Sequence, residues 1–256
     1  MSERRQAPGV SPTERHARHQ QLASVTPRGA ARFLVIVVLS LTALSLIGQA
    51  AKHFLPDFVL RDRFAETFDV DQEGNIPTLY SALAILGCAY LLWVIARVER
   101  EIGGRFTWHW RLMAVIFVGL AADEYLAIHE EINPRLNLSD FTQFSAAAIM
   151  VVFVLGFAVV FFPLLLQLPP PVRGLFVLAG ATFLSGAVVM ETVGGHYVSV
   201  WGHDSMKYVL CTTLEELLEM MGIVLFIHAL LRYLTQGGRE VLLALRLRAH
   251  PERAGT

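Results

Sequence analysis

Six apolar stretches constrain what this chain can fold into. They cover approximately residues 33–51, 76–96, 112–128, 144–166, 174–193 and 208–233. An α-helix rises about 1.5 Å per residue, so about 20 apolar residues are enough to cross the hydrocarbon core of a bilayer. The sequence therefore predicts an all-α, polytopic membrane protein, a bundle of six transmembrane helices.

The composition agrees with this fold class. Of 256 residues, 54% are hydrophobic and only 17% are charged, which is too apolar for an ordinary soluble domain of this length. We predict one transmembrane domain over residues 31–235. A basic, disordered tail over residues 1–30 precedes it, and an amphipathic tail over residues 236–256 follows it.

Basic residues predict the orientation of the bundle, because lysine and arginine concentrate in cytoplasmic loops. With six spans, the tails and the two loops on their side hold 16 of the 21 basic residues. The other side holds only Lys52, Arg61, Arg63, Arg135 and Lys207. We therefore place both termini in the cytoplasm and the protein in a cell membrane, either a plasma membrane or an inner membrane.

Charge also limits the choice of partners. The formal net charge is −1, and the basic residues lie where membrane topology alone would place them, so we predict no nucleic-acid partner. The expected partner is the lipid bilayer itself. Aromatic residues fit this orientation as an interfacial belt, with the inner boundary marked by Trp93, Trp108, Trp110 and Tyr233, and the outer one by Tyr197 and Trp201.

The longest predicted outer loop covers residues 52–75 and mixes acidic residues with phenylalanines. This pattern predicts a short amphipathic helix lying on the outer surface. Asn75 is suited to cap the following span, and Pro77 falls in its first turn, where a missing N–H is harmless.

Six carboxylates lie within or at the edge of the apolar stretches: Asp123, Glu124, Glu191, Glu215, Glu216 and Glu219. A charge at the centre of a membrane helix costs roughly 2.5–3.5 kcal/mol, so such residues usually face a bundle interior and serve a function. The predicted topology puts all six in the outer half of the bundle. The six carboxylates should therefore lie at a similar depth in the bundle.

Several carboxylates in one small volume need neutralisation by protons, by basic side chains or by a metal ion. Because basic residues are scarce at this level, shared protons or a metal ion are favoured, and the metal would be a divalent ion, with zinc, iron, manganese and magnesium all open. The candidate ligands are Asp123, Glu191, Glu215 and Glu219, completed by His129 or His196.

The first functional hypothesis is a metal-dependent enzyme acting on a lipid or lipid-linked substrate, with Glu124 or Glu216 as general base for a metal-bound water. The chain has no H-E-x-x-H motif to support it. Two alternatives remain open. One is a cation- or proton-coupled transporter, and the other is a non-enzymatic scaffold or accessory subunit whose carboxylates lock helices together by hydrogen bonds.

Overall fold

The computed structural model describes residues 26–127, 142–202 and 205–236, and for residues 142–150 only the backbone. This part of the chain is entirely helical. Its elements are α2 (Pro27–Phe54), α3 (Val59–Phe68), α4 (Ile76–Glu101), α5 (Thr107–Leu126), α7 (Thr142–Gln167), α8 (Pro170–Leu184), η1 (Ser185–Met190), α9 (Glu191–Trp201) and α10 (Met206–Leu234).

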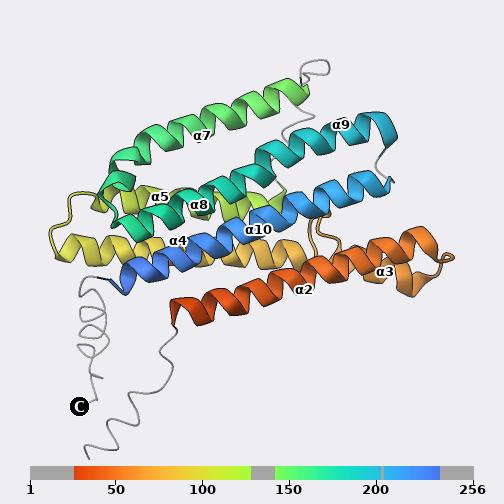
Figure 1. Cartoon of the computed structure of the whole chain (residues 1–256), viewed down its shortest axis with the longest axis horizontal. Coiled ribbons are helices and arrows are strands. Elements are labelled where there is room, and N and C mark those ends of the chain that lie inside the picture. The colour runs from red at the N-terminus through yellow and green to blue at the C-terminus, as the bar shows by residue number, and fades with distance from the viewer. Residues whose placement is uncertain (1–25, 128–141, 203–204, 237–256) are drawn as a thin grey trace, which may run out of the picture.

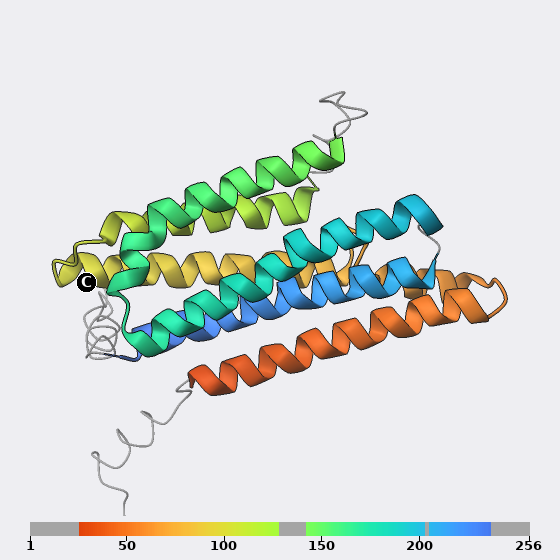
Figure 2. The same cartoon turned by 45° about the horizontal axis from the view of Figure 1, so that its top comes forward.

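The long helices run back and forth along one axis (Figures 1 and 2). We call the end where α2 begins and α10 finishes the basic end. The opposite end, where α3 lies and α10 begins, is the acidic end. The segment α8–η1–α9 forms one continuous path beside α10, and α2 packs on another side of α10.

Within the described residues, four helical segments are long and apolar enough to cross a membrane: α2, α4, α10 and the combined segment Pro170–Trp201. They match four of the six predicted spans. The other two correspond to α5 and α7, and of α7 the described part Val151–Gln167 is a shorter apolar helix. The count of six spans and the cytoplasmic termini stay predictions.

Large apolar side chains cover much of the outer surface. Phe33, Leu60, Val159 and Phe162 are examples, each more than half exposed. Extensive exposed apolar surface marks a membrane or an interaction face, because water does not solvate it well. The bundle is therefore compatible with a membrane location.

The predicted amphipathic helix in the 52–75 loop is confirmed as α3. It is fixed to the preceding turn by Arg61, whose buried guanidinium donates to the Leu55 carbonyl at 2.6 Å and to Asp57 at 2.6 Å. On its inner side, Ala65 packs against Gly48 of α2, where a Cβ would come within 2.9 Å of the Ala65 Cα. The loop thus folds back onto the end of α2.

The predicted cap of α4 is also confirmed. The Asn75 side-chain oxygen accepts from the Thr78 N–H at 3.2 Å, and Pro77 lies in the first turn. The Asn75 amide group also donates to the Asp69 carbonyl at 2.6 Å. One side chain therefore starts the helix and holds the end of α3 beside it.

We predict that Asn75→Ala lowers the free energy of unfolding by about 1 kcal/mol, since it removes an N-cap. Thermal unfolding in detergent measures the change. Gln72→Ala is the control, because its side chain is exposed and only its backbone carbonyl is used, by Thr78. Equal effects from both substitutions would contradict a capping role.

Helix α10 is the centre of the bundle, because it contacts α2, α4, α8, η1 and α9. On its α2 side, the His228 ring nitrogen Nδ1 lies 3.0 Å from the Pro27 carbonyl oxygen. This contact gives His228 a packing role. It also shows that α2 begins at Pro27, inside the segment 1–30 that the sequence predicts to be a tail.

The predicted inner aromatic boundary is corrected in part. Trp93 and Trp108 are 47% and 67% exposed, as interfacial residues are, but Trp110 is only 1% exposed. Its ring packs against Tyr233, with 5.1 Å between ring centroids. The Tyr233 hydroxyl donates to the buried Glu99 at 2.9 Å. Trp110 and Tyr233 are thus core residues of the basic end.

Candidate functional site

Three glutamates of α10 form the centre of the candidate site. Glu215, Glu216 and Glu219 lie within two turns of this helix, and each is half-buried. Residues three and four apart lie on the same side of a helix, so Glu215 and Glu219 share one face. Glu216 follows Glu215 in the sequence and lies three residues before Glu219, so it borders the same face.

The facing segment departs from regular α-helix at the level of these glutamates. Between α8 and α9, η1 is a π-helical stretch over Ser185–Met190, and Glu191 follows it directly. Such stretches are rare and often occur at functional sites. Two side chains bond back to carbonyls four residues earlier, Ser185 to Ala181 at 2.7 Å and Thr192 to Val188 at 2.6 Å, a pattern that often accompanies a bend in a helix.

Glycines bring this segment very close to α10. A Cβ on Gly186 would lie 2.6 Å from the Glu215 carbonyl oxygen and 2.8 Å from the Glu219 Cγ. A Cβ on Gly194 would lie 3.7 Å from the Glu215 carboxylate, an ordinary contact distance. The Glu215 side chain therefore reaches towards α9, while that of Glu219 passes η1.

In residues 26–127, 142–202 and 205–236, the charged groups that act on these glutamates are other carboxylates. Glu219 interacts electrostatically with Glu215, with Glu124 of α5 and with Glu191 of α9. Glu216 interacts with Glu219 and Glu124, and Glu215 with Glu191. We call Glu124, Glu191, Glu215, Glu216 and Glu219 the carboxylate cluster. Five of the six predicted acidic residues are thus brought together from three elements.

Sequence analysis missed a sixth member of this neighbourhood. Asp71, in the turn after α3, acts electrostatically on Glu215 and Glu216, and its carboxylate accepts from the Tyr208 hydroxyl at 3.2 Å. The sequence places Asp71 in an acidic surface loop, which gives no sign of this contact. The nearby Asp69 is buried and accepts from Gln49 at 2.5 Å, and burial raises the pKa of its carboxyl.

The remaining predicted site residues have different positions. Asp123 is half-buried beside Glu124 on α5, and of this pair Glu124 is the one that acts on Glu216 and Glu219. His196 is exposed on α9, five residues beyond Glu191, with its ring near Tyr197. His129 lies outside the described residues. Among residues 26–127, 142–202 and 205–236, no three His, Cys, Asp or Glu side chains form a group that could hold a metal ion.

An all-helical bundle with several helices able to cross a bilayer is the architecture expected of an integral membrane protein. Comparison with known families places the chain more closely. Residues 31–234 match the family described as "Domain of unknown function (DUF8692)", and the chain belongs to that family. Neither the curated proteins nor the solved structures gave a match.

Proposed function

We propose that this integral membrane protein uses the carboxylate cluster to bind a divalent cation, which serves chemistry on a lipid or lipid-linked substrate. The observation that carries the proposal is the position of Glu219. Within the described part of the chain, the charged residues that act on its carboxyl group come from α5, α9 and α10 itself, and they are Glu124, Glu191 and Glu215. Like charges this close in a partly desolvated bundle repel each other unless a cation or protons neutralise them.

The close packing of α10 against η1 supports a defined binding site, because it fixes the backbone positions of the glutamates. Gly186 lets the backbone of η1 meet that of α10 at Glu215, which fixes the starting points of the Glu215 and Glu219 side chains. Glutamate side chains carry three rotatable bonds, so a cation can draw their carboxylates together by rotation while the backbones stay in place.

The proposed roles follow from position. Glu215, Glu219 and Glu191 are the first ligands, because Glu215 and Glu219 interact both with each other and with Glu191. Asp123, His196 and His129 would complete the coordination shell. Glu124 or Glu216 would act as general base for a cation-bound water, whose acidity the metal increases. A carboxylate-rich shell suits magnesium or manganese, and added histidine suits zinc or iron.

Paired substitution of two proposed ligands tests the proposal. The protein is purified in detergent without chelator and titrated with manganese, magnesium and zinc, while bound metal and the thermal midpoint are measured. We expect a saturable rise in the midpoint for at least one metal, because a ligand that binds only the folded state stabilises it. In the variant Glu215→Gln with Glu219→Gln, the apparent affinity should fall by at least about tenfold.

The matched control is Glu66→Gln with Glu101→Gln, which removes the same charge at exposed positions on α3 and α4. It should bind metal as the wild type does. Metal-free protein with no metal response contradicts the proposal. Transport in liposomes that requires Glu215 and Glu219, without metal binding, would instead support the alternative of a proton-coupled transporter.

A further inference from the structure

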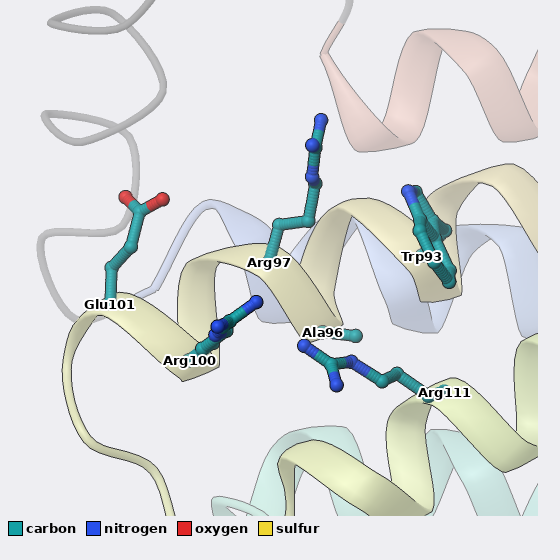
Figure 3. Close-up of a pocket in the computed structure, with 6 residues that line it drawn as sticks. All are labelled: Trp93, Ala96, Arg97, Arg100, Glu101 and Arg111. Atoms are coloured by element: carbon teal, nitrogen blue, oxygen red, sulfur yellow. The ribbon is translucent and has the colours of Figure 1, made fainter.

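A cavity lined by arginines lies at the basic end, away from the carboxylate cluster. Its volume is about 480 Å³, and it is partly open to the surface, where Arg97 and Arg100 are exposed. The lining residues come from the end of α4 and the beginning of α5: Trp93, Ala96, Arg97, Arg100, Glu101 and Arg111. Figure 3 shows Arg100 and Arg111 extending towards each other beside Ala96, while Glu101 points away from them.

Local sequence explains why this space exists. Trp93, Ala96, Arg97 and Arg100 are spaced three and four apart, so they share one side of α4. Ala96 is the small member of this row, and its short side chain leaves room between Arg100 and Arg111. Helix α5 packs along α4, which places Arg111 across the cavity from the α4 arginines.

The arginines have no charge partner in the described part of the chain. Within it, the guanidinium groups of Arg97, Arg100 and Arg111 make no hydrogen bond or ion pair, and the ion pairs that do occur belong to Arg61. Three guanidinium groups around one cavity repel each other. The positive-inside rule accounts for arginines at this end of the helices, but it does not require two helices to direct them into the same space.

With α4 crossing the bilayer from its first residue, the cavity falls at the depth of lipid headgroups. Arg97 lies 21 residues after Ile76, the first residue of α4, so it is about 31 Å along the helix. This distance is close to the thickness of the hydrocarbon core. The Trp93 side chain beside the cavity is 47% exposed, as is typical of tryptophan at the membrane interface.

We propose that this cavity binds the phosphate of an anionic membrane lipid, with Arg100 and Arg111 holding the phosphate from opposite sides. The planar guanidinium group suits phosphate because it donates two parallel hydrogen bonds. Basic pockets between membrane helices on the basic side of the bundle are suited to anionic headgroups. The lipid tails would lie along the exposed face of α4 beside Trp93.

The test uses the full-length protein in detergent micelles with added dioleoyl phosphatidylglycerol, dioleoyl phosphatidylcholine or inorganic phosphate. Thermal midpoints are measured, and native mass spectrometry counts retained lipids. We expect a saturable stabilisation by phosphatidylglycerol that exceeds the effect of phosphatidylcholine. In Arg100→Gln with Arg111→Gln, the apparent affinity for phosphatidylglycerol should be weaker by about tenfold or more.

The control variant is Arg32→Gln with Arg105→Gln, which removes two exposed arginines from the same end without touching the cavity. It should keep the preference for phosphatidylglycerol. Arg100→Lys with Arg111→Lys keeps the charge but loses the paired hydrogen bonds, so intermediate binding is expected even if the glutamine variant folds poorly. Equal loss in the control, an unchanged preference in the glutamine variant, or the same stabilisation by inorganic phosphate alone would overturn the proposal.

Discussion

Replacing Trp110 with alanine is expected to lower the free energy of unfolding by roughly 3–5 kcal/mol, the range for removing a large aromatic side chain from a core. Trp110 is only 1% exposed, and its ring contacts those of Tyr233 and Phe176, with centroid distances of 5.1 and 6.1 Å. The loss is one of packing, because within a membrane there is little hydrophobic driving force between helices.

Thermal unfolding in detergent, or unfolding by added sodium dodecyl sulfate, measures this effect. Trp108→Ala is the matched control, because Trp108 lies two residues earlier on the same helix and is 67% exposed. Its substitution should change stability by no more than about 0.5 kcal/mol. If both variants lose the same stability, Trp110 acts as an interfacial anchor, as its sequence position predicts, and not as a core residue.

The contrast between Trp108 and Trp110 shows where sequence-based prediction stops. Apolar run length predicted where the helices lie, and four of the helical segments found among the described residues are long and apolar enough to cross a bilayer. The cap at Asn75 and the helix α3 followed from local chemistry that acts over a few residues. By contrast, the distance of Trp110 from the helix end predicts its depth but not its direction, and the direction is set by α10 through Tyr233.

The candidate site was predictable to a similar extent. Topology placed the glutamates of α5, α9 and α10 at a similar depth, and in the structure Glu124 and Glu191 act electrostatically on Glu219. Asp71 was missed because its approach to Tyr208 depends on how the loop after α3 folds back. The π-helical stretch η1 was missed because a shift in backbone hydrogen bonding has no compositional signature.

Whether the carboxylates can surround one cation depends on the positions of individual side chains, which the sequence does not determine. The predicted ligand set assumed convergence within one coordination shell, which requires side-chain rotamers as well as shared depth. The described residues hold no such group of three, although the backbones at Gly186 and Glu215 are already in contact. The positions of the helices could thus be predicted from the sequence, but the positions of the carboxylate groups could not.

Gly222→Ala is expected to destabilise the bundle by roughly 1–3 kcal/mol, as added volume does in a tightly packed interior. A Cβ at Gly222 would lie 2.7 Å from the Phe183 Cβ and 2.8 Å from the Phe183 backbone nitrogen. Since backbone atoms cannot rotate away, α10 must separate from α8. Small residues at such crossings are what allow membrane helices to approach closely.

Gly180→Ala on α8 is the control, because a Cβ there meets nothing within 4 Å. It should leave stability unchanged or raise it slightly, since alanine favours helix over glycine. Gly186→Ala should act as Gly222→Ala does, and it should also weaken metal binding, because it displaces η1 from Glu215 and Glu219. A contrary outcome is that Gly222→Ala weakens metal binding as much as Gly186→Ala does, at equal stability. Metal binding would then depend on the overall distance between α8 and α10, and the contact at Gly186 would have no specific role in the site.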